Sequence, residues 1–269
     1  MSLPQALRPG WPAPPNITAL MSGRAGGISQ APFDSLNLRP AALSAPGDAL
    51  ADRAQAVTEN QRRFAQALGA APVWLDQVHG AAVLRLTADH LQPGARLAQA
   101  DASVSTVPGI ACAVLVADCL PVLFCSADGR AVAAAHAGWR GLAAGVLDNT
   151  VAALCQAAGC PADQLLAWLG PCIGPAAFEV GSDVLLAFGA DLRQPDPAFF
   201  VASPRPDGSL RWQANLPALA RRRLAGLGVQ HVSGGAHCTV ADASRFFSFR
   251  RDGRAGPTGR MAAAIAIRN

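Results

Sequence analysis

The sequence predicts an α/β fold in one domain, with mixed β-sheets flanked by helices. Short apolar runs typical of strands alternate along the chain with amphipathic segments typical of helices. No fixed-period repeat and no linker divides the 269 residues into two compact halves, so we expect one domain over residues 1–269. Apolar residues make up 51% and charged residues 15% of the chain, which is enough apolar material for a large core.

The N-terminal part is expected to be mostly irregular. Residues 1–20 open with many prolines and predict an extended lead-in. Residues 21–38 and 39–50 are rich in Gly and small side chains and predict loops. The first helix is predicted over residues 51–68, where apolar side chains recur at helical spacing and Gly69 supplies a stop.

The centre of the chain reads as strands. The run 111–116 is continuously apolar with β-branched residues, as in a strand buried on both faces. Asp128-Gly129 is a strong turn dipeptide and predicts a hairpin between two such runs. The predicted central strands are residues 73–78, 81–86, 111–116, 122–126 and 131–135.

The remaining elements alternate between helix and strand. A long helix over residues 142–158 should end at Gly159, and residues 189–210 form a Pro- and Asp-rich loop. Shorter helices are predicted at residues 184–188 and 216–227. The last predicted strands are residues 165–169, 229–232, 246–249 and 262–267.

The residue counts exclude several kinds of chemistry. All 22 basic residues are Arg, which rules out a Schiff-base lysine and a P-loop lysine. The chain has no Tyr and only five His, too few for several copper centres. A net charge of +4 with no basic tail does not favour nucleic-acid binding.

Cysteine usage and the apolar pattern indicate an unanchored protein of the cytoplasm. Seven Cys without a CxxC pair or a regular framework predict reduced thiols. The N-terminus has no signal-peptide pattern. The most apolar stretch, residues 109–125, is interrupted by Asp118 and Pro121 and is shorter than the roughly 20 residues of a membrane helix.

Three predicted strand ends carry metal-capable side chains, His79, Cys119 and His136. Two imidazoles and a thiolate suit Zn²⁺ with one position open for water or substrate, which is the pattern of a catalytic zinc. A second interpretation needs no metal: Cys119 is the nucleophile and His136 its base, with Asp118 or another group orienting the imidazole. Both interpretations use the same atoms, and the residue pattern leaves both open.

Several charged residues are candidates for substrate binding. Arg140 stands in a Gly-flanked turn at the start of a helix, where an anion is favoured. Without lysine, Arg alone must provide cationic phosphate recognition. Glu179 follows a turn-rich segment and is a candidate acid or base. The Arg candidates are Arg24, Arg140, Arg250, Arg251 and Arg260.

Five segments in this order resemble one known family: QVHG, ADCLPVLF, AAAHAGWRG, GPCIGPAAFEVG and FFSFRRDG…TGRMA. The chain resembles the polyphenol oxidase or laccase-domain family, whose members are mostly described as multi-activity purine nucleoside phosphorylases and in one case as a peptidoglycan editing factor. The similarity runs from Gly23 to Met261. The chain departs from the family pattern at Leu36-Asn37-Leu38-Arg39, where the family commonly has LNLG followed by a His, so no role is assigned to that His. Two further departures are Phe249 in place of a Tyr and a turn lengthened by residues 254–257, which leaves the position of Arg260 relative to Arg250 open.

The resemblance implies a single α/β domain and a zinc ion held by His79, Cys119 and His136. It implies phosphorolysis of adenosine, inosine and methylthioadenosine, and adenosine deamination as a further activity. The fold is also similar to a group of cysteine-hydrolase toxins. The expected partners are therefore a purine nucleoside and phosphate, the latter between Arg140 and the Arg250, Arg251 and Arg260 cluster.

Three other functions stand beside this leading hypothesis. A copper-dependent polyphenol oxidase ranks low because the His count is small and Met occurs only at positions 1, 21 and 261. A hydrolase editing peptidoglycan precursors would use Cys119 and His136 or zinc-bound water. A purely binding role is disfavoured by the convergence of His, Cys and Arg at strand ends. Zinc is thus the expected cofactor in preference to copper.

Overall fold

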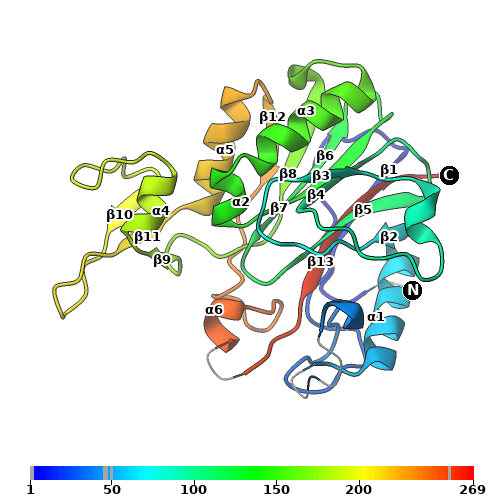
Figure 1. Ribbon diagram of the computed structural model, residues 1–269, viewed down its shortest axis with the longest axis horizontal. Coiled ribbons are helices and arrows are strands. Elements are labelled where there is room, and N and C mark those ends of the chain that lie inside the picture. Colours follow the sequence, from blue (N-terminus) through cyan, green and yellow to red (C-terminus); the bar gives the residue numbers. More distant parts are fainter. Residues whose placement is uncertain (1–2, 45–47, 49–50, 254–255) are drawn as a thin grey trace.

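Two β-sheets stacked face to face form the centre of the computed structural model, which describes residues 3–44, 48, 51–253 and 256–269 (Figure 1). One sheet has four strands in the order β1-β13-β5-β2 and the other six in the order β12-β8-β6-β7-β4-β3. The four are β1 (Ile17–Met21), β13 (Met261–Ile267), β5 (Ile110–Val116) and β2 (Ala71–Val73). The six are β12 (His231–Gly234), β8 (Leu165–Leu169), β6 (Leu120–Ser126), β7 (Val132–Ala137), β4 (Ala102–Ser105) and β3 (Val83–Arg85).

Both sheets are mixed, which confirms the predicted fold class. In the four-stranded sheet β13 runs antiparallel to β1 and β5, while β2 and β5 are parallel. In the six-stranded sheet β6 pairs antiparallel with β7 and β8, whereas β12–β8 and β3–β4 are parallel. The β6–β7 pair is the hairpin predicted around Asp128-Gly129.

Strand β5 explains why the central runs are apolar throughout. Its side chains alternate between two cores: Cys112, Val114 and Val116 face the second sheet, while Ala111, Ala113 and Leu115 face the other way. A strand covered on both faces needs apolar residues at every position, and all seven residues of β5 are buried. The continuous run expected at residues 111–116 is therefore confirmed as a doubly buried strand.

Helices cover the outer faces, so the molecule has four layers in the order α/β/β/α. Helix α1 (Ala54–Leu68) packs Phe64 and Leu68 on the four-stranded sheet, and its left-handed C-cap is the predicted Gly69. Helices α3 (Val146–Ala158) and α5 (Leu216–Gly226) cover the six-stranded sheet. The other helices are α2 (Trp139–Ala143), α4 (Ser182–Ala187), α6 (Phe249–Asp252) and the 3₁₀ turns Ala41–Leu43, Ala88–Leu91 and Ala162–Gln164.

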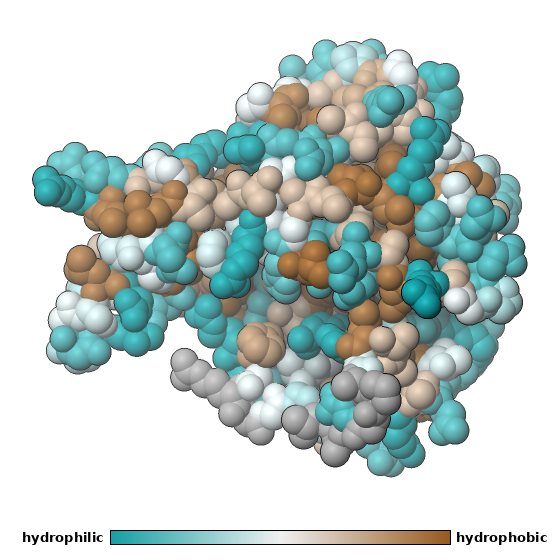
Figure 2. All heavy atoms as spheres, viewed as in Figure 1, coloured by the Kyte–Doolittle hydropathy of each residue, from teal (hydrophilic) through white to brown (hydrophobic). Residues whose placement is uncertain are grey.

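A third, small sheet stands out from one side of the molecule (Figure 1). It contains β9 (Glu179–Val180), β10 (Phe200–Ala202) and β11 (Trp212–Ala214) in the order β10-β11-β9, all antiparallel. Figure 2 shows brown, apolar patches on this projection, which carries the exposed side chains of Leu186, Val201 and Leu210. The loop predicted over residues 189–210 thus contains one strand.

Two predicted elements are wrong, and a third, the strand over residues 73–78, is displaced to β2 at Ala71–Val73. The helix expected over residues 142–158 is interrupted, because Gly145 adopts a left-handed φ of 93° between α2 and α3. The segment 246–249 is not a strand: Phe246 and Phe247 are buried in irregular backbone, and the Ser248 side chain accepts a hydrogen bond from Arg251 N to cap α6.

The N-terminal expectations meet the structure only in part. Residues 17–20 of the predicted lead-in form β1 together with Met21, and β1 pairs with β13 at the edge of the four-stranded sheet. Its first residues, 1–2, and residues 45–47 and 49–50 of the predicted 39–50 loop lie outside the described residues, as do 254–255 of the lengthened turn. None of the helices in the described ranges is long and apolar enough to cross a membrane.

Candidate functional site

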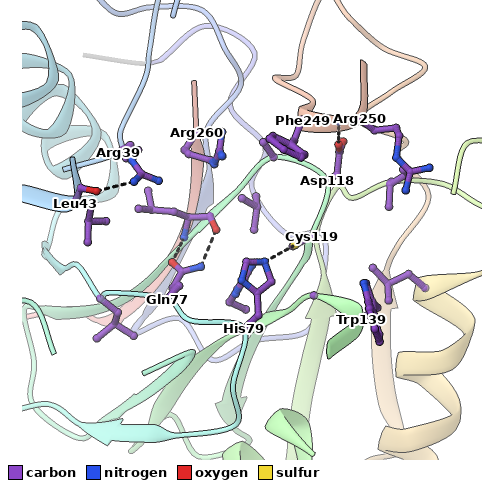
Figure 3. A pocket seen from close by; sticks show the side chains of 18 of the residues that line it. Arg39, Leu43, Gln77, His79, Asp118, Cys119, Trp139, Phe249, Arg250 and Arg260 are labelled. Atoms are coloured by element: carbon purple, nitrogen blue, oxygen red, sulfur yellow. Dashed lines mark hydrogen bonds between the residues drawn. The ribbon is translucent and has the colours of Figure 1, made fainter. Parts of the chain in front are cut away.

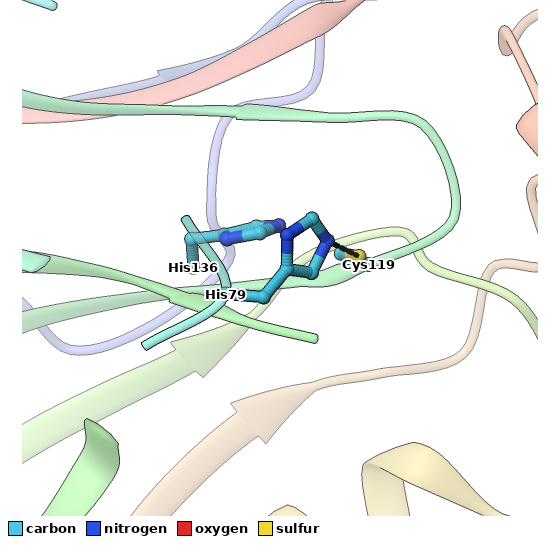
Figure 4. A group of neighbouring side chains, drawn as sticks. All are labelled: His79, Cys119 and His136. Atoms are coloured by element: carbon cyan, nitrogen blue, oxygen red, sulfur yellow. Dashed lines mark hydrogen bonds between the residues drawn. The ribbon is translucent and has the colours of Figure 1, made fainter. Parts of the chain in front are cut away.

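Three segments that are distant in sequence bring His79, Cys119 and His136 together (Figure 4). His79 lies in the loop between β2 and β3, Cys119 directly before β6, and His136 on β7. Their ligand atoms lie within 4.8 Å of one another, and His79 Nε2 is 3.8 Å from Cys119 Sγ. The two imidazole rings meet edge to face, with centroids 4.8 Å apart. The structure thus gathers the three side chains singled out in the sequence.

A buried carboxylate, Asp101, orients two of these three side chains. Its Oδ1 accepts hydrogen bonds from His136 Nδ1 at 2.8 Å and from His79 N at 2.9 Å. Its Oδ2 accepts from Gly80 N at 2.6 Å and Val78 N at 3.2 Å. Because a carboxylate can only accept, His136 carries its proton on Nδ1 and presents Nε2 to the site. The group that orients His136 is therefore Asp101 and not Asp118.

Two positions of the site have left-handed backbone. His79 has a φ of 61° and Asp118, next to Cys119, a φ of 91°. Side chains other than Gly adopt this region rarely, and such residues cluster at functional sites. At His79 the hydrogen bonds of three successive backbone N–H groups to Asp101 hold the turn.

The glycines of the HAGWRG segment allow close packing around the site. A Cβ on Gly138 would lie 3.0 Å from both Cys119 Sγ and His79 Cδ2. A Cβ on Gly141 would lie 2.7 Å from Gly80 O, which is shorter than a van der Waals contact. Helix α2 therefore starts against the His79 loop only because these positions have no side chain.

The electrostatics favour a thiolate at Cys119. Burial raises its pKa, but the positive charge of His136 and hydrogen bonds from both imidazoles outweigh burial and bring the pKa to about 6. Burial lowers the pKa of His136, but the Cys119 thiolate and Asp101 outweigh it and raise the pKa to about 9. The thiolate is both the metal-binding and the nucleophilic form of Cys.

The donor set fits zinc. Tetrahedral zinc with Zn–S near 2.3 Å and Zn–N near 2.0 Å separates sulfur and nitrogen ligands by about 3.5 Å, and the observed separation of His79 Nε2 and Cys119 Sγ is 3.8 Å. A cysteine–histidine nucleophile needs one imidazole beside sulfur, whereas here two point at it. The second imidazole favours metal binding.

The three side chains form part of the wall of a cavity of about 340 Å³ (Figure 3). Arg39, Arg250 and Arg260 line it, together with aromatic rings and the apolar residues 115–117. The Gln77 amide is already occupied, since it donates to Leu115 O at 2.9 Å and accepts from Leu115 N at 2.7 Å. The other lining residues include Leu43, Leu75, Asp76, Leu115, Val116, Ala117, Asp118, Gly138, Trp139, Ile173, Phe178, Leu216 and Phe249.

Asp118 lines the cavity, but both its oxygens already accept hydrogen bonds. Oδ1 accepts from Thr239 Oγ1 at 2.5 Å, and Oδ2 from Ser248 Oγ at 3.0 Å and Arg250 N at 2.6 Å. The carboxylate thus fastens the start of α6 to the strand end that carries Cys119. The structure supports a positioning role for Asp118.

Of the six predicted substrate-binding residues, Arg250 and Arg260 line the cavity and four do not. Each of the four is occupied elsewhere. Arg24 pairs with Asp34 and Arg251 with Asp252, while the Arg140 guanidinium stacks 4.4 Å over the Trp139 ring. Glu179 forms an ion pair with Arg205, which lowers the pKa of its carboxyl group.

The sequence patterns did not reveal Asp101 and Arg39. Asp101 is a single acid within QADAS, and Arg39 stands where the family pattern has another residue. A weak signal existed for Asp101, because it is an acidic residue directly before the apolar–polar alternation of β4. Nothing in the sequence connected either residue with His136 or Arg260.

Comparisons with known proteins cover nearly the entire chain. Residues 18–268 match the family described as multi-copper polyphenol oxidoreductase laccase. A purine nucleoside phosphorylase of Pseudomonas aeruginosa is 49% identical over 263 residues, 98% of either chain. The purine nucleoside phosphorylase YfiH of Escherichia coli is 46% identical over 259 residues, 96% of either chain.

Solved structures agree. The crystal structure of a Neisseria meningitidis protein superposes with a TM-score of 0.82 at 43% identity and covers 98% of this chain and 100% of its own. YlmD from Geobacillus stearothermophilus also has a TM-score of 0.82, at 29% identity, covering 98% and 96%. On this evidence the chain belongs to the laccase-like polyphenol oxidoreductase family, whose relatives include proteins named purine nucleoside phosphorylase.

Proposed function

We propose that this chain is a zinc-dependent purine nucleoside phosphorylase that acts on adenosine, inosine and methylthioadenosine. One observation carries the proposal: a single cavity contains a His/Cys/His metal-binding set, three guanidinium groups and several aromatic rings. These are the groups needed for phosphate, a sugar and a planar base. The names of the 49% and 46% identical relatives support it.

In this proposal His79, Cys119 and His136 hold the zinc. A bound zinc supplies a Lewis acid that polarises an oxygen of phosphate or of water. Asp101 positions both His residues, and its hydrogen bond keeps His136 Nδ1 protonated and Nε2 free for the metal. Asp118 positions the Cys119 strand end against α6.

The reaction forms one bond and breaks one. A phosphate oxygen attacks C1′ of the ribose, and the bond from C1′ to the purine nitrogen breaks. Its electron pair leaves with the purine, which takes up the proton that the attacking hydrogen phosphate gives up, and the products are ribose 1-phosphate and the free base. In this proposal guanidinium groups of the cavity hold phosphate in line with C1′, and the Trp139 and Phe178 side of the cavity receives the base.

The structure does not favour the copper oxidase that the family description suggests. In the described ranges, His79, Cys119 and His136 are the one group of three or more His, Cys, Asp or Glu side chains close enough to share a metal. A multi-copper centre needs several such groups with many more imidazoles. The residues present suit a single ion.

The test is a nucleoside assay with zinc-loaded protein, run with and without phosphate. We expect ribose 1-phosphate and free base from adenosine or inosine only when phosphate is present. Cys119→Ala should lower kcat/KM at least about a hundredfold, because loss of a ligand removes the metal. Cys155→Ala, which replaces a thiol of α3 outside the cavity, is the matched control.

Other outcomes assign other chemistry. Inosine formed from adenosine without phosphate would identify hydrolytic deamination by the same site. Intact nucleosides together with cleavage of peptidoglycan precursors would replace the phosphorylase by a hydrolase. Full phosphorolysis by Cys119→Ala would refute a role for the His/Cys/His set.

A further inference from the structure

The three arginines of the cavity have no acidic partner. Across the described residues, no ion pair joins Arg39, Arg250 or Arg260 to a carboxylate, whereas eight other arginines are paired in this way. An unpaired guanidinium in a partly buried cavity is costly unless an anion occupies it. The unpaired charges therefore mark where the ligand carries negative charge.

Arg39 and Arg260 form a pair of like charges. Arg39 donates from Nη2 to Leu43 O at 2.7 Å, and Arg260 from Nη1 to Thr258 O at 2.9 Å and Gly259 O at 3.2 Å. These bonds fix both groups and use only part of their five N–H donors. Both residues line the same two cavities, and burial first, then the charge of Arg39, lowers the pKa of Arg260.

Arg250 is placed differently. Its guanidinium lies 5.6 Å from the centre of the Phe178 ring, and Nη1 donates to Glu179 O at 3.1 Å. In Figure 3, Arg250 and Trp139 lie on one side of His79 and Cys119, while Arg39 and Arg260 lie on the other. The cavity thus has two cationic ends, and only the Arg39 end has two converging guanidinium groups.

A second cavity of about 190 Å³ adjoins this end, and Arg39 and Arg260 line both cavities. Thr258 also lines the smaller one, as do Asp48 and Asp52, and Asp52 Oδ2 accepts hydrogen bonds from Ser29 Oγ and Asn37 Nδ2. Among the residues that the structure describes, the buried hydroxyl of Thr258 has no hydrogen-bond partner, and the residue as a whole is 6% exposed. A buried hydroxyl without a partner is rare and points to a polar ligand.

We propose that Arg39 and Arg260 form the phosphate subsite, at the boundary of the two cavities, with the Thr258 hydroxyl as a neutral donor. Two guanidinium forks and a hydroxyl match the tetrahedral oxygens of phosphate. The nucleoside then enters from the Trp139 and Phe178 side. This inference rests on the proposed phosphorolysis for its choice of anion.

Kinetics and direct binding test the subsite together. In zinc-loaded protein, Arg39→Gln and Arg260→Gln should each raise the KM for phosphate at least about tenfold, while the KM for inosine changes less than about twofold. Thr258→Val should give a smaller rise. Arg193→Gln removes a guanidinium from an exposed loop and is the matched control. Calorimetric titration of each protein with inorganic phosphate alone should show the same order of affinities.

The outcomes separate this inference from the proposed function. If wild-type protein binds phosphate through Arg39 but cleaves no nucleoside, the subsite stands and the phosphorylase fails. If phosphorolysis proceeds and Arg39→Gln resembles Arg193→Gln in its phosphate KM, the subsite is overturned and the phosphorylase stands. Arg39→Lys keeps the charge without the fork, so an intermediate KM for the folded protein would support bidentate binding and a wild-type KM would contradict it.

Discussion

At the scale of single residues, the site depends most on Asp101. One buried carboxylate accepts four hydrogen bonds, from His136 Nδ1 and from the backbone of residues 78–80. It therefore sets both the proton position on one imidazole and the left-handed turn that carries the other. A residue outside the His/Cys/His set and outside the cavity lining thus shapes two of the three candidate ligands.

We predict that Asp101→Asn weakens zinc binding by about 10–100-fold, because the amide has one acceptor oxygen for four donors and places an NH₂ group against N–H groups. The free energy of unfolding should fall by about 1–3 kcal/mol for the hydrogen bonds lost. Zinc affinity is measured by chelator competition and stability by urea unfolding. Asp89→Asn, at an exposed acid, is the control, and equal zinc affinity in both variants would contradict the prediction.

The contact between Asp101 and His136 could not be predicted from the sequence. His79, Cys119 and His136 could be chosen because each follows a strand-like run of the sequence, which is a local pattern, although the structure ends β2 at Val73 and places His79 in the loop that follows. Asp101 lies 35 positions before His136, and their contact depends on how β4 and β7 pair. Pairing register is a property of the folded sheet and does not follow from composition or spacing. Arg39 and Arg260 lie even further apart in sequence.

At the scale of elements, the short helix α2 closes the site. It begins directly after His136 and the β7 strand and ends where Gly145 turns the chain into α3. The sequence pattern indicated one helix over 142–158 because apolar spacing continues through the break. The sequence pattern does not reveal that Gly141 packs closely against Gly80 O. This contact holds α2 against the His79 loop.

We predict that Gly141→Ala lowers the free energy of unfolding by about 1–3 kcal/mol and weakens zinc binding, because its methyl group would lie 2.7 Å from Gly80 O and must push the His79 loop away. Gly226→Ala is the matched control in α5, where an added Cβ meets nothing within 4 Å. That change should leave zinc binding intact and add up to about 1 kcal/mol of stability. Identical effects of the two substitutions would contradict this packing argument.

At the scale of the whole molecule, the packing of the four layers brings the candidate ligands together from three separate chain segments. Apolar patterning predicts the fold class, the doubly buried strands and the single domain. It does so because the positions of apolar residues reflect which faces of each strand or helix are covered by another layer. The small third sheet was not foreseen, because its strands are only two or three residues long and lie in Pro-rich sequence. A metal at this site would tie two connections between the stacked sheets, at His79 and Cys119, to strand β7 at His136.

We therefore predict that zinc raises the melting temperature of the metal-free protein. At a free zinc concentration of 100 Kd the free energy of unfolding rises by about 2.7 kcal/mol. For a chain of this size that corresponds to roughly 5–10 °C. Scanning calorimetry with and without zinc measures the shift. It should vanish in Cys119→Ala and persist in Cys155→Ala, and a full shift in Cys119→Ala would place the zinc elsewhere.

The two glycines around Trp139 have a wider consequence. HAGWRG is the most recognisable string in this chain, yet Gly138 and Gly141 are there because backbone and ligand side chains come too close for a methyl group. Such a motif records a shape, and the same shape can serve different reactions. Two proteins that share the HAGWRG motif can therefore carry names as different as laccase and phosphorylase. The motif itself does not indicate which reaction either protein catalyses. If Arg39 and Arg260 bind phosphate as proposed, these two positions, which line both cavities, would sort such relatives by chemistry better than the glycine motif does.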